Sequence, residues 1–115
     1  MSVERLPAEI AAVLRTYRGA LADAFGERLV AVRLFGSRAR GEARPDSDID
    51  VAVVIRGLSD AELDRAIDLA YEAWWSTGRQ SPMISPLVWS EERAADALSR
   101  ELRIAEDIER EGIPL

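Results

Sequence analysis

The chain has 115 residues, of which 48% are hydrophobic and 31% charged, and its formal net charge is −6. This length predicts a single domain over residues 1–115, and the negative charge argues against tight, sequence-independent binding to nucleic acid, which needs a basic surface. Cysteine and histidine are both absent, which excludes disulfides, Ser-His-Asp triads and zinc-thiolate sites, so that any metal would be a hard ion bound by oxygen. The sequence contains no apolar run of about 18 residues, and residues 1–5 lack a signal-peptide pattern, which favours a cytoplasmic protein without a membrane span.

The first half of the chain predicts one helix and two strands. Hydrophobic residues recur every three or four positions from Leu6 to Phe25, which is typical of an amphipathic helix, and Gly26 is a suitable end for it. The runs 29–35 and 49–55 are short and rich in β-branched residues, so each predicts a strand. The second strand is nearly all apolar, and we therefore expect it to be covered on both faces.

The second half predicts two more helices and a third strand. A capping box at Ser59 begins a helix that ends near Gly78, and we expect its aromatic stripe, including Tyr71 and Trp74, to lie in the core. The run 83–89 predicts a strand that Pro86 restricts to a sheet edge or a bulge. Ser90 begins a last helix, which extends toward residues 112–114 and has a candidate break near residues 99–100. Core burial is also the expectation for Trp75 and Trp89, although a subunit interface remains an alternative for all three tryptophans.

A polar stretch between the first two strands carries the chemistry. Gly36 allows a phosphate to approach the main chain, and Ser37 adds a hydroxyl donor. Asp48 and Asp50 are two residues apart, so on a strand both carboxylates point to the same face and repel each other unless a cation lies between them. The alternative is an ordinary strand-ending turn followed by a solvated acidic loop, in which Asp46 and Asp48 are turn formers.

The joint arrangement is more specific than any of its parts. A strand is followed by Gly36-Ser37, ten residues, Asp48-Ile49-Asp50 and a second strand. This resembles the signature of the polymerase-β-like nucleotidyltransferases, and within that superfamily the segments 36–41 and 47–50 resemble the minimal nucleotidyltransferase (MNT) group. The ending Glu-Gly-Ile-Pro-Leu at 111–115 is similar to the usual ending of that group.

The resemblance implies an α/β fold, with a small mixed sheet flanked by helices, and a nucleotide site. Gly36 and Ser37 would hold the β- and γ-phosphates of a nucleoside triphosphate, with Arg38 and Ser47 as further nucleotide contacts. Asp48 and Asp50 would be the catalytic residues and would bind Mg²⁺ or Mn²⁺. For Arg38, Arg40 and Arg44 two interpretations remain open: contact with phosphate, or a solvated basic loop.

One feature of the superfamily is missing. A third carboxylate normally lies on the next core strand, but the corresponding strand here contains no acid, and Met83 and Ser85 occupy the matching positions. Neither side chain can act as a carboxylate base. Glu91 and Glu92 follow the strand and are candidate replacements, although a helix start explains them as well.

The resemblance implies an enzyme that moves AMP from ATP to a hydroxyl. Proteins of this group often act as antitoxins that adenylylate a tyrosine of a HEPN-domain ribonuclease toxin, so the implied partner is a HEPN toxin. The alternative is a catalytically impaired nucleotide-binding module that neutralises its partner by binding. Transfer to a small molecule, as in aminoglycoside nucleotidyltransferases, is the least favoured hypothesis, and the sequence leaves the preferred nucleotide and the oligomeric state open.

Overall fold

The computed structural model describes residues 6–79 and 81–115 of the chain. Residues 1–5, in which the sequence shows no signal-peptide pattern, lie outside the described part. No helix in that part is long and apolar enough to span a membrane. The elements follow one another as α1 (Ala8–Phe25), a 3-10 turn η2 (Gly26–Arg28), β1 (Leu29–Phe35), α2 (Ser37–Arg40), β2 (Ile49–Ile55), α3 (Asp60–Ser76), β3 (Ile84–Ser90), α4 (Glu91–Ser99), α5 (Arg103–Glu111) and β4 (Ile113–Pro114).

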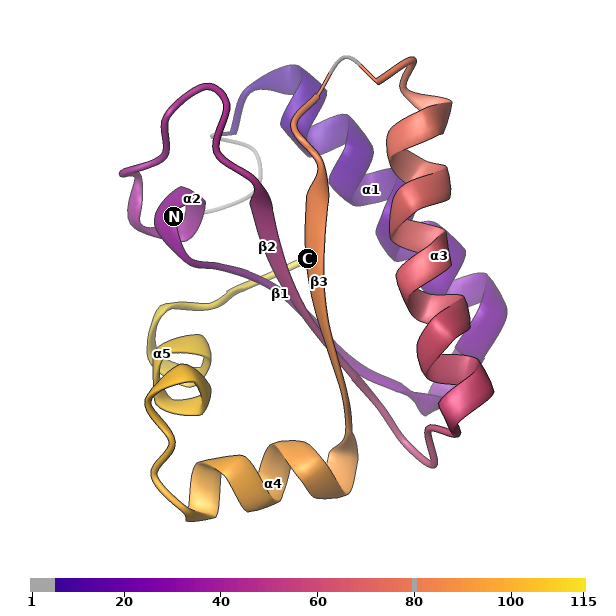
Figure 1. Cartoon of the computed structure of the whole chain (residues 1–115), viewed down its shortest axis with the longest axis vertical. Coiled ribbons are helices and arrows are strands. Elements are labelled where there is room, and N and C mark those ends of the chain that lie inside the picture. Colours follow the sequence, from indigo (N-terminus) through magenta and orange to yellow (C-terminus); the bar gives the residue numbers. More distant parts are fainter. Residues whose placement is uncertain (1–5, 80) are drawn as a thin grey trace.

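The strands form one mixed sheet in the order β3-β2-β1-β4. β1 pairs antiparallel with β2 and with β4, whereas β2 and β3 run parallel and are joined by α3. Figure 1 shows α1 and α3 together on one side of this sheet, with α4 and α5 at the other side. The predicted α/β fold, a small mixed sheet flanked by helices, is confirmed.

The core lies mainly between the sheet and the pair α1 and α3. Alternate residues of β2, from Ile49 to Ile55, are fully buried against these helices. The hydroxyl of Tyr17 on α1 is buried as well and donates a 2.9 Å hydrogen bond to the carbonyl oxygen of Ala66 on α3. Ala52, on the opposite face of β2, is also buried, so the prediction that this strand is covered on both faces is confirmed at its centre.

The predicted core face of α3 is partly wrong. Its buried residues are Ala66, Leu69, Ala70 and Ala73, whereas Tyr71 and Trp75 are each 49% exposed. Small side chains let the helix approach the sheet closely, and the large aromatic side chains are displaced to its edge. Hydrophobic periodicity identifies the apolar side of a helix but does not determine which part of that side faces the core. Trp74 and Trp89 are half-buried.

Several local predictions are confirmed. Ser59 and Glu62 form the predicted capping box, and the Ser90 side chain accepts the backbone N–H of Arg93. The last helix is broken into α4 and α5 after Ser99. β3 is an edge strand, as Pro86 predicted. The sequence did not predict α2 or the short strand β4.

Candidate nucleotide and metal site

Gly36 lies between β1 and α2, at the N-cap of α2, with a φ of 75°. Glycine adopts such a positive φ at little cost, whereas residues with a Cβ atom rarely do. A Cβ atom at this position would collide with the carboxylate oxygen Oδ2 of Asp50, so the Asp50 carboxylate lies directly against the Gly36 backbone. Ser37, the first residue of α2, follows this contact. The turn is therefore shaped around the carboxylate.

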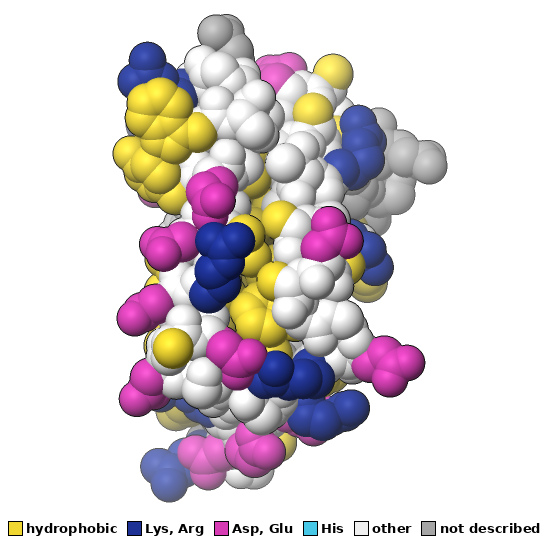
Figure 2. Space-filling view, turned by 90° about the vertical axis from the view of Figure 1, so that its right-hand side faces the viewer, with side chains coloured by type: hydrophobic (Ala, Val, Ile, Leu, Met, Phe, Trp, Pro, Cys, Tyr) yellow, Lys and Arg dark blue, Asp and Glu magenta, His cyan; other side chains and the backbone are white. Residues whose placement is uncertain are grey.

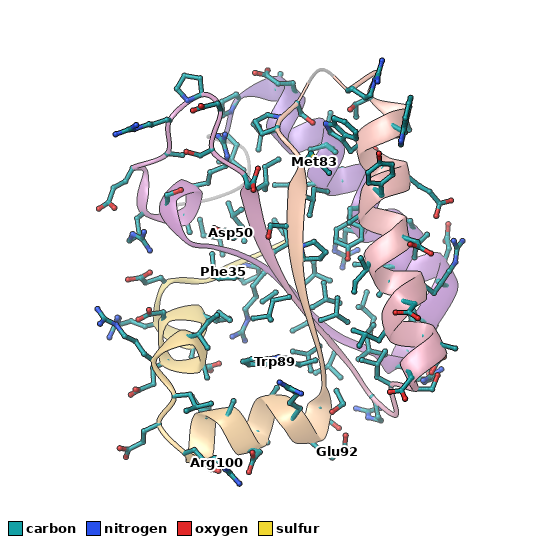
Figure 3. All side chains as sticks on the ribbon, in the orientation of Figure 1. Phe35, Asp50, Met83, Trp89, Glu92 and Arg100 are labelled. Carbon is teal, nitrogen blue, oxygen red and sulfur yellow. The ribbon has the colours of Figure 1, made fainter. Side chains whose placement is uncertain are left out.

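Asp50 reaches Gly36 because of the strand register. β2 places Asp50 opposite Phe35, the last residue of β1, and Figure 3 shows these two residues near one end of the sheet. Ile49 and Val51 are fully buried against α1 and α3, so the alternation of the strand directs Asp50 to the opposite face. Asp48 precedes the strand and is exposed, while Asp50 is half-buried. Gly36, Ser37, Asp48 and Asp50 thus lie together at one end of the two central strands.

The charges of Asp48 and Asp50 at this end of the sheet favour a bound cation. Burial raises the pKa of Asp50 above its ordinary value, the negative charge of Asp48 raises it further, and the guanidinium groups of Arg40 and Arg38 lower it. A divalent cation would relieve this repulsion. The donors are carboxylate oxygens, which suit Mg²⁺ or Mn²⁺, and in the described part of the chain no three acidic residues cluster as a complete metal site. A cation held by Asp48 and Asp50 would therefore need further oxygen ligands from water or phosphate.

Arg38 organises the loop that leads to Asp48. Its side chain is only 8% exposed, and its Nη2 donates to the carbonyl oxygens of Ser47, Arg44 and Pro45 at 2.6, 3.2 and 3.4 Å. Its Nε also donates to the Ser47 carbonyl oxygen, at 3.2 Å. The hydroxyl of Ser47 accepts the backbone N–H of Arg44 at 2.9 Å. Arg38 and Ser47 therefore shape the loop, and their predicted contacts with a nucleotide remain predictions.

Helix α5 closes the other side of the Gly36 turn. Arg40 forms ion pairs with Glu42 at 3.1 Å and with Glu111 of α5 at 3.3 Å. Gly36 and Arg40 line a cleft of about 380 Å³ together with Arg103 and Asp107 of the same helix. Sequence reasoning missed the α5 residues, and only the family-like ending at 111–115 pointed to this end of the chain. Arg44 is exposed, as the interpretation of a solvated basic loop had it.

The strand register shows which residues of β3 lie beside the two aspartates. In the parallel pair of β2 and β3, Asp50 is opposite Ser85. Met83, whose carbonyl oxygen accepts the N–H of Ile49 at 2.9 Å, lies at the level of Asp48. Paired residues on neighbouring strands project to the same face, so Met83 and Ser85 lie beside Asp48 and Asp50 on one face of the sheet. Both residues are exposed.

Glu91 and Glu92 do not replace the third carboxylate that the resemblance implies. They follow Ser90, which is five residues beyond Ser85 along β3, or about 16 Å at the usual rise of a strand. Figure 3 shows Glu92 at the end of β3 opposite to Asp50 and Met83. Glu91 instead pairs with Arg56 at 3.4 Å. The substitution that the sequence left open is therefore excluded by distance.

Comparisons with known proteins bear on the family and the fold of this chain. The nucleotidyltransferase domain family matches residues 14–108. A solved structure of a protein assigned as a minimal nucleotidyltransferase is 35% identical, over 100% of this chain and 97% of the other, with a TM-score of 0.52. A toxin-antitoxin crystal structure with AMP-PNP is 19% identical over 85% of this chain and 68% of the other, with a TM-score of 0.53, and shows likeness of fold. None of the curated proteins matches significantly.

Proposed function

The chain belongs to the nucleotidyltransferase domain family, and on that premise we propose that it transfers AMP from ATP to a hydroxyl group with Mg²⁺ or Mn²⁺. The observation that carries the proposal is the contact between the Asp50 carboxylate and the Gly36 backbone. It unites the candidate phosphate turn and the candidate metal ligands, which the sequence separates by ten residues.

Each residue has a role that its position supports. Gly36 lets a phosphate approach the main chain, and the hydroxyl of Ser37 is available as a donor beside it. Asp48 and Asp50 would hold the cation through their carboxylate oxygens. The bound cation would neutralise charge on the triphosphate and on the departing pyrophosphate. Arg38 would act indirectly, by holding the loop that positions Asp48.

The proposed reaction is an in-line displacement at the α-phosphorus. The acceptor oxygen forms a bond to that phosphorus, the bond to the oxygen bridging to the β-phosphate breaks, and pyrophosphate leaves. The acceptor must also lose its proton. Met83 and Ser85 cannot take that proton as a carboxylate would, so we expect it to pass to solvent and the transfer to be slow.

We further propose that the acceptor is a tyrosine of a HEPN-domain toxin and that the chain is its antitoxin in the cytoplasm. Two observations support a protein partner of this kind. The chain resembles the minimal nucleotidyltransferases over its whole length, and its fold is similar to that of a toxin-antitoxin structure.

A second candidate function rests on Ser85. This serine lies opposite Asp50, where the resemblance to the superfamily implies an acid, and the second proposal is that the chain retains nucleotide binding and lacks transfer. In that case it would neutralise its partner by binding alone.

A labelling experiment separates the two functions. The chain is mixed with a candidate HEPN-domain toxin, Mg²⁺, and ATP labelled at either the α- or the γ-phosphate. Transfer of AMP predicts that only the α-label enters the partner, and that Asp48→Asn with Asp50→Asn abolishes the signal. Asp46→Asn is the matched control, because Asp46 is exposed on the same loop and lies outside the site. Inhibition of the partner without label, and without need of ATP, would select the binding module instead.

A further inference from the structure

Helix α3 presents two parallel stripes of exposed side chains. Ile67, Tyr71 and Trp75 recur at four-residue intervals and are 43%, 49% and 49% exposed. Asp64, Asp68 and Glu72 are exposed as well, and each precedes a member of the apolar stripe by three residues. Residues three apart are neighbours on a helix surface, so an acidic stripe runs beside the apolar one. Figure 2, which looks onto the side of the molecule where α3 lies, shows large hydrophobic side chains near one end with acidic side chains along the same side.

The apolar stripe continues into a cleft that ends at the candidate metal site. Tyr71 and Ile67 line a cleft of about 360 Å³ with Met83 and Ser85 of β3 and with Asp48. Met83 is itself 40% exposed. Asp68, from the acidic stripe, is also part of the cleft wall. A partner that binds along α3 would therefore reach the side of Asp48 that faces Met83 and Ser85.

The chemistry of the surface selects a basic occupant. Helix α3 carries five acidic residues and a single basic one, Arg65, which pairs with Glu72 at 2.8 Å. Trp75 also makes a cation–π contact: the guanidinium carbon of Arg79 lies 4.6 Å from the centroid of its ring. Guanidinium and ammonium groups bind aromatic faces and carboxylates alike. Both the charge and the aromatic rings thus complement arginine- or lysine-bearing apolar segments.

We propose that the exposed face of α3 is the docking surface for a basic amphipathic helix of a protein partner. The apolar side of the partner helix packs on Ile67, Tyr71 and Trp75, and its basic residues pair with Asp64 and Asp68. Docking along α3 places the partner beside Asp48. That the partner then offers its hydroxyl at Asp48 and Asp50 rests on the proposed function.

The test uses two synthetic peptides as long as α3. In one, leucine recurs every three or four positions and arginine fills the remaining face; in the other, glutamate replaces arginine. Binding of the fluorescently labelled peptides to the full chain is followed by anisotropy at low and at high salt. We expect the basic peptide to bind at least tenfold more tightly than the acidic one and to weaken with salt. Tyr71→Ala with Trp75→Ala should raise its dissociation constant at least tenfold, and Asp64→Asn with Asp68→Asn should raise it and flatten the salt dependence.

Matched controls come from the opposite end of the molecule. Leu98 and Leu102 are 41% and 47% exposed, and Glu92 and Glu106 are exposed acids. Leu98→Ala with Leu102→Ala, and Glu92→Gln with Glu106→Gln, should leave peptide binding unchanged. Binding that survives loss of Tyr71 and Trp75, or equal binding of both peptides, overturns the proposal.

Two further measurements separate the proposal from other outcomes. Asp50→Asn should bind the basic peptide normally without nucleotide, so docking can hold even where AMP transfer fails. Sedimentation velocity tests a second copy of the chain as the occupant. A dimer that Trp75→Ala converts to a monomer would show that the face is covered by another copy, and would overturn the proposal of a basic partner.

Discussion

The contact between Gly36 and Asp50 joins backbone conformation to site chemistry. Gly36 has a positive φ, and its lack of a Cβ makes room for the Asp50 carboxylate. The Arg38 side chain is buried and donates hydrogen bonds to the carbonyl oxygens of the loop. At the scale of single residues, the candidate site therefore depends on the lack of a side chain at Gly36 and on the buried guanidinium group of Arg38.

Gly36→Ala tests the absent side chain. The new methyl group collides with Asp50, and alanine is strained at this φ. We therefore expect the free energy of unfolding to fall by about 1 to 3 kcal/mol. Binding of Mg-ATP, measured by calorimetry, should be lost as well. The control is Gly19→Ala on α1, where a Cβ has no atom within 4 Å. There we expect stabilisation of about 0.5 to 1 kcal/mol, and equal effects at both positions would contradict the interpretation.

Arg38→Met tests the role of the buried Arg38 guanidinium group. It keeps much of the apolar volume but removes the donors to the carbonyl oxygens of Ser47 and Arg44. Hydrogen bonds to charged groups contribute about 1.5 to 3 kcal/mol, so urea denaturation should show a loss of that order. Arg44→Met, at an exposed position on the same loop, should change stability by less than about 0.5 kcal/mol. A phosphate-binding Arg38 without a structural role would show no loss of stability in the absence of nucleotide.

At the scale of elements, a bidentate ion pair fastens α3 to the turn before β1. Nη1 and Nη2 of Arg28 donate to the two carboxylate oxygens of Glu62, each at 2.7 Å. The same carboxylate accepts the backbone N–H of Ser59 in the capping box. The Arg28 guanidinium also donates to the carbonyl oxygens of Arg56 and Gly57, so one side chain connects the end of β2 to the start of α3.

This arrangement predicts a specific dependence of stability on pH. The hydrogen bonds from Arg28 and Ser59 lower the pKa of Glu62 from 4.5 to about 2. A lowered carboxyl pKa means that the folded state favours the charged form, so this stabilisation is complete above about pH 4.5 and disappears as the pH falls toward 2. The difference in unfolding free energy between the native chain and Glu62→Gln should be constant near neutral pH and shrink across that window.

Urea denaturation at a series of pH values checks this. In the background of Arg28→Met, Glu62→Gln should change the free energy of unfolding by less. The hydrogen bond from Arg28, the largest cause of the lowered Glu62 pKa, has been removed there. A difference that does not change between pH 4.5 and 2 would refute the assignment of the shift to this pair.

At the scale of the whole molecule, the two faces of the sheet are packed unequally. The large buried cluster comes from α1, α3 and the strands, and α4 and α5 contribute none of its members. These two helices bury Ala97, Ala105 and Ile108, and a cleft of about 220 Å³ separates them in part from the sheet. Elements with few buried apolar contacts open at lower free energy than the rest.

We therefore expect α4 and α5 to open before the remainder of the fold. In native-state hydrogen exchange, amides in the middle of these helices should exchange faster than those in the middle of α1 and α3. Mg-ATP should slow exchange in α2 and the loop 41–48 without giving α4 the protection of α1. Uniform protection of all four helices would contradict this picture.

Much of the local structure followed from the sequence, because it depends on neighbours in the chain. The caps at Ser59 and Ser90, the stop at Gly26 and the edge position required by Pro86 arise from backbone hydrogen bonds or sterics within a few residues. The proximity of Gly36, Asp48 and Asp50 was likewise expected, from their joint arrangement and the family resemblance, and their binding of nucleotide and metal stays a prediction.

Other features required the tertiary structure, because they depend on residues far apart in the chain. Strand register alone decided that Ser85 lies opposite Asp50 and that Glu91 lies at the far end. Packing distance decided that the alanines of α3 face the core and that Tyr71 and Trp75 remain exposed. The sequence by itself determined the glycine, serine and aspartates of the candidate site and the ends of several helices and strands. The tertiary structure decided which groups meet, since a contact across a sheet is set by register and by close packing, and local residue preferences specify neither.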